Sequence, residues 1–166
     1  ITVQKIKVMK NVCLFLIIII FNIGFTQENQ DLYDIIESVS SERIEKDIRT
    51  LVGFGTRHTL SDTISKSRGI GAARRWIKSE FESISEKCNN CLEVYFQKNY
   101  FTPKDGDRII KPVWVNNVVA IQRGKTHPNR FIIMSGDIDS RISDPTNFKN
   151  DSPGANDNAS GMAGTI

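Results

Sequence analysis

The hydrophobic pattern of this chain changes period once, and that change limits the folds it can adopt more than any other feature. Before Cys88, apolar residues recur every three to four positions, at 44, 48, 51 and 52 and again at 70, 73, 77, 81 and 84. This spacing predicts helices with one buried face. After Cys91 the period becomes two, because Leu92, Val94 and Phe96 alternate as in a strand. The chain therefore reads as helices followed by strands.

The rest of the pattern fits the same order. A short helix is predicted over residues 30–39, and a second strand over residues 113–121. Residues 131–134 are continuously apolar, as expected of a central strand covered on both faces. A polar loop follows, and residues 159–166 resemble the first turns of a buried helix. The predicted fold class is α/β, a three-layer α/β/α domain that is incomplete at its carboxyl end.

The first 26 residues have the polarity of an export signal. Lys5, Lys7 and Lys10 precede an apolar run over residues 12–21, and no acidic residue occurs among the 26. This order is typical of a secretory signal peptide. Met9 is a better start than Ile1, which makes residues 1–8 a candidate for upstream translation. We expect a secreted or periplasmic protein with no stable membrane insertion after cleavage; an uncleaved anchor and a core helix are the alternatives.

The charge balance argues against nucleic acid as a partner. The formal net charge is +3, from 22 basic and 19 acidic residues. Removing the three lysines of the signal leaves 19 basic and 19 acidic residues over residues 27–166, a net charge of zero. No basic stripe remains to bind a phosphate backbone.

Cys88 and Cys91 are the two cysteines of residues 27–166. Outside the cytosol two nearby thiols usually pair, so we predict a small structural disulfide before the first strand. A zinc half-site is one alternative, but it needs a second pair of ligands. A redox pair is the other, but it would normally open a helix.

The glycine pair and the two histidines of this chain indicate structural roles rather than catalytic ones. Gly69 and Gly71 resemble part of a dinucleotide motif, but no strand pattern precedes them. We interpret them as small residues for close helix packing. The chain has two histidines, His58 after a predicted helix and His127 in a turn. Both are interpreted as structural or solvated, so a Ser-His-Asp arrangement has little support.

Three aspartates follow the predicted strand at residues 131–134. Asp137 and Asp139 stand two apart, so their side chains should point the same way. Asp157 opens the next helix-like segment. Ligands bind outside the carboxyl ends of strands in open α/β sheets, and three carboxylates gathered there would repel one another without a cation. The pattern predicts a metal site; a solvated acidic loop is the alternative.

The residues around these aspartates resemble metallopeptidase family 28, the co-catalytic zinc aminopeptidases. The matching stretches are GDIDS at residues 136–140 and PGANDNASG at residues 153–161. The second stretch is specific. The resemblance covers residues 40–166, with supporting similarity to the amino-terminal helical region and a preceding strand of the family at residues 51–58, 68–73 and 117–120.

The resemblance implies a zinc-exopeptidase domain over residues 27–166, with a mixed central sheet between helices. Asp157 matches the aspartate that bridges two zinc ions, and Asp139 matches the aspartate that orients the first metal ligand. The bond from Asp157 to Asn158 matches a position where the family often has a cis peptide. The implied protein is a secreted aminopeptidase-like exopeptidase, which hydrolyses peptide substrates with metal-activated water.

The sequence departs from the family at one candidate ligand. Asp137 stands where the family usually has histidine; a carboxylate also binds zinc, so Asp137 is a tentative ligand and the number of ions, one or two, stays open. The general-base glutamate is expected beyond Ile166, which predicts that residues 1–166 alone are inactive. A glutaminyl-cyclase-like zinc enzyme and a non-catalytic metal- or peptide-binding module of the same fold are the alternatives. The sequence sets no oligomeric state.

Overall fold

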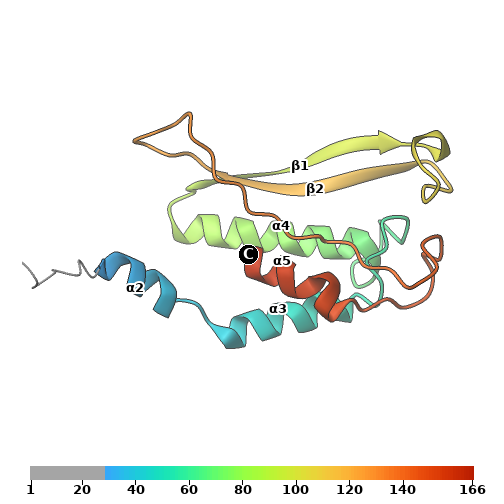
Figure 1. Ribbon diagram of the computed structural model, residues 1–166, viewed down its shortest axis with the longest axis horizontal. Coiled ribbons are helices and arrows are strands. Elements are labelled where there is room, and N and C mark those ends of the chain that lie inside the picture. The colour runs from blue at the N-terminus through green and yellow to red at the C-terminus, as the bar shows by residue number, and fades with distance from the viewer. Residues whose placement is uncertain (1–28) are drawn as a thin grey trace, which may run out of the picture. The chain divides into compact units, whose positions relative to one another are not determined.

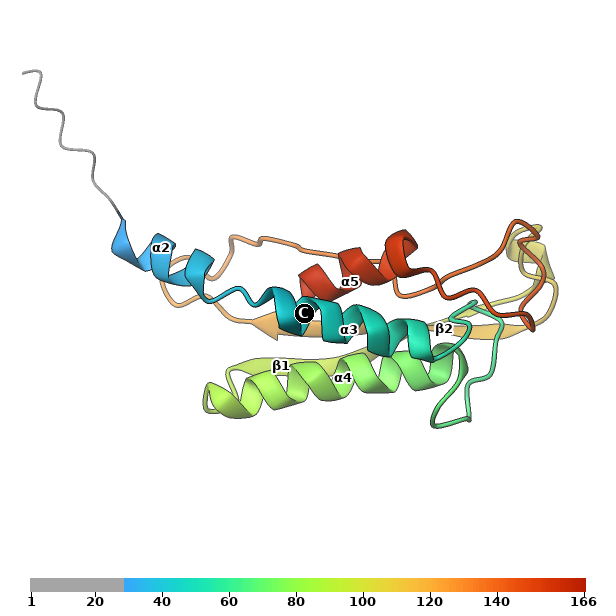
Figure 2. The same ribbon diagram turned by 90° about the horizontal axis from the view of Figure 1, so that it is seen from below.

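The computed structural model describes residues 29–166 (Figures 1 and 2). The signal peptide expected at residues 1–26 lies outside the described residues, so it stays a prediction. Two compact units divide the chain, with the boundary after Val39, and each is described by itself.

The described part of the first unit is one short helix, α2 (Gln30–Glu37), as predicted. It has no buried residue, and its apolar side chains Leu32, Tyr33, Ile35 and Ile36 are 48–64% exposed. The Gln30 side chain donates to Asp34 Oδ1 at 2.8 Å, one turn along. Across the described residues, each helix is too short or too polar to span a bilayer.

The second unit begins with α3 (Ser41–Gly53). The Ser40 hydroxyl accepts a hydrogen bond from the Arg43 backbone N–H at 3.1 Å, and Glu42 lies in the first turn. A side-chain cap and an early acidic residue both stabilise a helix start. The helix ends at Gly53.

The longest helix, α4 (Gly69–Lys87), buries the face that carries Ile70, Ala73 and Ile77. A Cβ on Gly71 would collide with the backbone of Thr63. The glycine is therefore needed for a close approach, as predicted, but the approach is to the loop before the helix rather than to another helix.

A disulfide joins Cys88 and Cys91, with 5.4 Å between their Cα atoms, as predicted. Asn89 and Asn90 between them have φ values of 57° and 59°. Asparagine tolerates this left-handed conformation better than most residues, because its short side chain bonds locally. The turn brings the chain from α4 directly into the first strand.

Two antiparallel strands form the sheet. β1 (Leu92–Phe101) pairs with β2 (Val113–Gln122), in a register that places Leu92 opposite Gln122 and Phe101 opposite Val113. The connection contains the 3₁₀ turn η1 (Pro103–Asp105), where Thr102 and Asp105 form a capping box. One face of this hairpin lies over α4 (Figures 1 and 2).

The core is built from helices that are far apart in sequence. The π-helical turn η2 (Ala155–Ala159) leads into α5 (Ser160–Thr165), and both contact α3. Apolar burial between these helices and α4 therefore fixes where the chain returns after its long loop. The buried cluster comprises Leu51, Ala73, Ile77, Ala159 and Met162.

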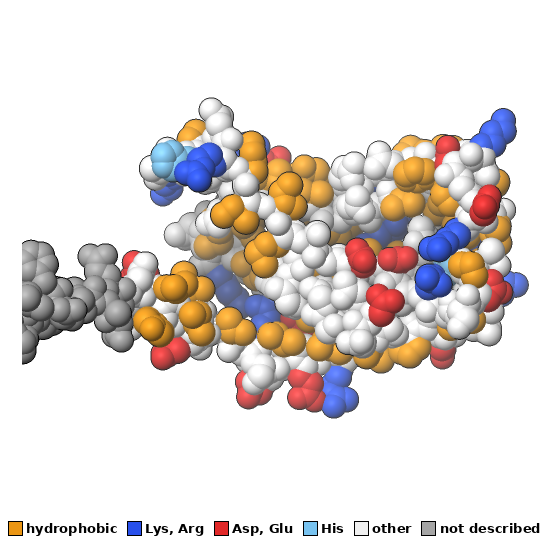
Figure 3. All heavy atoms as spheres, viewed as in Figure 1, with side chains coloured by type: hydrophobic (Ala, Val, Ile, Leu, Met, Phe, Trp, Pro, Cys, Tyr) orange, Lys and Arg blue, Asp and Glu red, His pale blue; other side chains and the backbone are white. Residues whose placement is uncertain are grey.

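The strand predicted over residues 131–134 is wrong for this structure. Phe131, Ile132, Ile133 and Met134 have no regular structure and are 70–95% exposed. Figure 3 shows hydrophobic side chains on the surface of the molecule. A strand needs a neighbouring strand whose backbone groups bond its own N–H and C=O groups. In the sheet of the described residues β1 and β2 pair with each other, and residues 131–134 are not part of it. Residues 29–166 therefore show a mixed α/β arrangement with a two-stranded sheet.

Candidate metal site

The three aspartates lie in one irregular segment, residues 135–159, which we name the carboxylate segment. Asp137 and Asp139 lie in its extended first part, and Asp157 lies inside η2. All three side chains are exposed. Asp157 has non-helical angles, φ −115° and ψ 94°, and its peptide bond to Asn158 is cis, as the resemblance implies.

Arg57 holds this segment in place. Its side chain is 1% exposed, and its guanidinium donates four hydrogen bonds, all to backbone carbonyls. One acceptor lies at the end of α3, one beside Asp139, and two immediately before η2. The acceptors are Leu51 at 2.9 Å, Ile138 at 3.0 Å, Pro153 at 2.7 Å and Gly154 at 2.9 Å.

The charge of Arg57 is buried at a cost. Burial lowers the pKa of the guanidinium from its usual value, and the negative charge of Asp139 opposes that shift. A guanidinium stays protonated in proteins, so its donors remain available to the four carbonyls. Arg57 therefore joins the two halves of the carboxylate segment to α3, and positions the backbone between Asp137 and Asp139 and just before Asp157.

Buried hydroxyl groups make a second connection. Thr56 Oγ1 and Ser152 Oγ are 2.9 Å apart, and the two residues form an isolated parallel β-bridge. Ser140 Oγ donates to the Ser152 carbonyl at 2.6 Å and accepts from the Arg57 backbone N–H at 3.0 Å. These bonds satisfy groups that burial would otherwise leave unpaired, so the loop between residues 140 and 152 closes tightly at its base.

Two glycines let the backbone approach closely at this site. Gly154 has φ +49°, and a Cβ there would lie 2.5 Å from the Asp157 carbonyl and 2.6 Å from Ser140 Cβ. A Cβ on Gly136 would lie 2.8 Å from Met162 Cα, in α5. The turn before Asp157 therefore requires glycine for its angle and for its space.

Asn158 fixes the start of α5. Its Oδ1 atom accepts from the Gly161 backbone N–H at 3.0 Å, which satisfies a donor that the helix itself leaves free. The side chain of Asn158 thus points along the helix, while Asp157 lies exposed beside it.

His58 is structural, as predicted. Its Nδ1 accepts from the Leu60 backbone N–H at 3.0 Å, so the proton lies on Nε2, which bonds the Pro145 carbonyl at 3.0 Å. The ring is 6% exposed. Both ring nitrogens are therefore committed to the backbone.

Residues 29–166 do not form a complete metal shell by themselves. Within that part of the chain, no group of three or more His, Cys, Asp or Glu side chains lies close enough to hold an ion. A catalytic zinc usually has three protein ligands, so the described residues do not fit zinc on their own. Asp139, which the resemblance assigns the role of orienting a ligand, accepts a hydrogen bond at its Oδ2 atom from Thr59 Oγ1 at 3.4 Å. The ligand roles of Asp137 and Asp157 stay predictions.

Sequence reasoning missed Arg57 as a positioning residue. It lies in residues 51–58, one of the stretches that resemble the family, but arginine is almost never fully buried and reads as a surface residue. The local pattern contains no sign of its acceptors, because three of them lie 81 to 97 residues away.

Comparison with curated proteins finds relatives in fungi. The chain is 41% identical over 135 residues to a "Probable zinc metalloprotease" of Pyrenophora tritici-repentis, 44% identical over 135 residues to one of Pyrenophora teres f. teres, and 42% identical over 133 residues to one of Pyricularia oryzae. These alignments cover 80–81% of the chain but 26–31% of each relative. The chain therefore spans less than a third of the length of these relatives.

No family model matches the chain, and no solved structure does. Identity above 40% over four-fifths of the chain supports common ancestry with proteins named as zinc metalloproteases.

Proposed function

We propose that this chain is part of a zinc-dependent peptidase. The observation that carries the proposal is its 41% identity, over 81% of its length, to a protein named as a zinc metalloprotease. The carboxylate segment supports it, because Arg57 and the buried hydroxyls hold that segment while Asp137 and Asp157 stay exposed. An irregular backbone held this firmly, with acidic side chains left in solvent, suits ligand binding better than it suits packing.

The finer proposal is an exopeptidase of the aminopeptidase type with a three-layer zinc-exopeptidase fold and peptide substrates. In it Asp157 bridges two zinc ions, Asp137 is a further ligand, and Asp139 orients a ligand. In this proposal the general base and the other ligands lie beyond Ile166, as the family resemblance implies. Zinc, when bound, polarises a carbonyl and lowers the pKa of a water molecule. The chain's own contribution is to fix the backbone of the carboxylate segment.

The proposed location is outside the cytoplasm, either secreted or periplasmic. The lysines and apolar run of residues 1–26 support it, and so does the disulfide between Cys88 and Cys91, because disulfides persist in oxidising compartments. Mass spectrometry of the exported protein should show an amino terminus near Gln27. An intact Met9 on membrane-bound protein would contradict export.

Zinc stoichiometry of the full-length protein tests the proposed site. Asp157→Asn should remove tight binding of both ions and abolish release of amino-terminal residues from peptides, since one carboxylate serves both. Asp137→Asn should weaken one ion selectively, and Asp137→His should restore or improve binding, because imidazole suits zinc. Asp107→Asn, an exposed aspartate between β1 and β2, is the matched control and should bind zinc as wild type does.

The outcomes separate the levels of the proposal. Two zinc ions bound equally tightly in wild type and Asp157→Asn would exclude Asp157 as a ligand. Equal binding in both Asp137 variants would exclude Asp137 alone. If the protein bound zinc but cleaved only internal bonds, in peptides whose amino termini are blocked, the proposal of a zinc peptidase would stand. The aminopeptidase type would then be excluded.

A further inference from the structure

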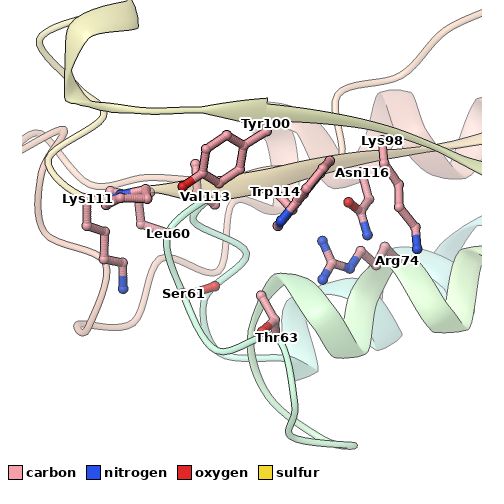
Figure 4. Close-up of a pocket in the computed structure, with 11 residues that line it drawn as sticks. Leu60, Ser61, Thr63, Arg74, Lys98, Tyr100, Lys111, Val113, Trp114 and Asn116 are labelled. Carbon is pink, nitrogen blue, oxygen red and sulfur yellow. The ribbon is translucent and has the colours of Figure 1, made fainter.

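A cavity of about 730 Å³ lies away from the carboxylate segment, between α4, the β1–β2 hairpin and the loop before α4 (Figure 4). The hairpin face that covers α4 packs tightly at Val118, against the apolar core. Farther along the same face the packing stops and the cavity opens. The side chains that give it its chemistry are Arg74, Lys98, Tyr100, Lys111, Trp114 and Asn116.

The strand register explains how these side chains come together. Lys98 is paired with Asn116, and Tyr100 with Trp114, in the antiparallel ladder. Residues two apart on a strand share a face, so all four project from one side of the hairpin. Arg74 faces them from α4. Figure 4 shows Arg74, Lys98 and Asn116 converging at one end of the cavity, beside the Trp114 indole.

The cavity is strongly positive. Three of the residues that line it are cationic and none is acidic. Among the ion pairs between described residues, none involves Arg74, Lys98 or Lys111. Burial and the neighbouring charge of Arg75 lower the pKa of Arg74 from its usual value. A cation that is half-buried without a counterion favours an anion beside it.

One wall of the cavity is aromatic. The rings of Tyr100 and Trp114 lie 5.1 Å apart at 47°, yet these side chains are 52% and 57% exposed. Large aromatic side chains contribute strongly to binding when a planar partner covers them. The two rings thus present an apolar surface next to the cations.

We propose that this cavity binds a small organic anion that carries an aromatic ring. Its anionic group lies between Arg74 and Lys98, and its ring contacts Tyr100 and Trp114. A nucleic acid strand fits less well, because residues 27–166 carry no net charge and no extended basic stripe. The site does not depend on zinc and does not rest on the proposed peptidase activity.

Calorimetric titration of the full-length protein with hippurate tests this site. Hippurate carries a carboxylate and a phenyl ring. We expect saturable binding of one molecule, reduced about tenfold in Arg74→Met, because charge-assisted hydrogen bonds are the strong ones. Lys98→Met, an exposed position, should also weaken binding. Arg123→Met is the matched control, since Arg123 pairs with Glu93 on the same hairpin outside the cavity, and should leave the affinity unchanged.

Further probes define the ligand chemistry. Benzylamine has the ring with the opposite charge and should not bind. Phenyl phosphate carries a phosphate where hippurate carries a carboxylate. Whichever of the two binds more tightly identifies the anionic group that the cavity prefers. Because a carboxylate also binds zinc, the titration is repeated on Asp157→Asn, where binding should persist.

Three results would overturn the proposal. They are the absence of saturable binding by both anions, equal affinity in wild type, Arg74→Met and Lys98→Met, and loss of hippurate binding in Asp157→Asn. If Arg74→Met does not fold, Lys98→Met and an Asn116→Asp variant decide, since a carboxylate at 116 should repel the anion and abolish binding.

Discussion

The helix–hairpin region, residues 69–122, and the carboxylate segment, residues 135–159, are stabilised in different ways. The first consists of α4, β1 and β2, whose buried apolar side chains follow the periods of helix and strand. The second has little regular structure before η2 and is held by hydrogen bonds from Arg57, Thr56 and its own serines. The helices and strands of the first region follow from local sequence periods, whereas the backbone of the second is held by residues far along the chain.

The difference shows where precision comes from in this molecule. Apolar burial tolerates small shifts, because it is roughly proportional to area and has no direction. Hydrogen bonds from a planar guanidinium to four fixed carbonyls do have direction. The segment that carries the candidate ligands is therefore the one whose backbone is fixed by directional bonds.

Loss of Arg57 should have the largest effect. Arg57→Met removes four hydrogen bonds and leaves buried carbonyls unpaired, so we expect the free energy of unfolding to fall by about 4 kcal/mol. Urea denaturation of the full-length protein measures the loss. Hydrogen exchange should rise first at Ser152 and Ala159, whose amides bond within this network, before it rises in the hairpin.

Arg49→Met is the control for that variant. Arg49 is an exposed arginine of α3 that pairs with Glu45, so its loss should change the free energy of unfolding by less than about 0.5 kcal/mol. If Arg57→Met lowered the free energy of unfolding no more than Arg49→Met does, the carboxylate segment would not depend on the guanidinium.

Ile77→Ala tests the apolar side of the comparison. Ile77 is 1% exposed in the core between α3, α4 and α5, and its truncation should cost about 3 kcal/mol through lost burial and a residual cavity. Unlike the arginine variant, it should raise exchange in α4 and both strands together. Ile64→Ala, at an 88% exposed position, should be neutral. Exchange that rose only in the carboxylate segment would contradict this account.

Cys88→Ser should have a smaller effect. The disulfide closes a very short loop, so the chain-entropy model gives a stabilisation of about 2 kcal/mol. Thermal unfolding should report this loss while zinc content stays unchanged, since the cysteines are bonded to each other. Zinc lost from the variant would indicate that the pair is a metal half-site.

Asp62→Asn should have the smallest effect and should appear only in acid. Backbone N–H groups of Ser65 and Ile64 donate to Asp62 and lower its pKa below its usual value of 3.8. The charged form is thus favoured in the folded state. Its stabilisation is present above the unfolded pKa and is lost as pH falls through the folded pKa. The midpoint of thermal unfolding should therefore fall less below pH 4 in the variant; an unchanged slope would contradict the assignment.

The sequence predicted the helix–hairpin region well because its determinants are local. The predicted starts of β1 at Leu92 and of β2 at Val113 match the structure. Each follows from a period, a cap or a turn within a few residues. The disulfide followed from spacing and the expected compartment.

Residues 131–134 and the carboxylate segment that follows them could not be predicted in the same way. Residues 131–134 are apolar enough for a central strand. Apolar side chains indicate a preference for burial, but they do not show which neighbouring strand would pair with them. The sequence identified Asp137, Asp139 and Asp157 as candidates through family resemblance. It gave no sign that Arg57 would position their backbone, since that role exists only once distant carbonyls meet.

The distance along the chain between Arg57 and its acceptors sets an order of events during synthesis. Ribosomes add about 5–20 residues per second, so Ile138, 81 residues later, follows Arg57 after roughly 4–16 s. Through that interval α4 and the hairpin emerge while the guanidinium stays hydrated, because burying it unpaired is unfavourable. The nascent chain therefore contains α4 and the hairpin before it contains the carboxylate segment. Asp157 follows them, in a turn whose backbone is bonded by an arginine made a hundred residues before.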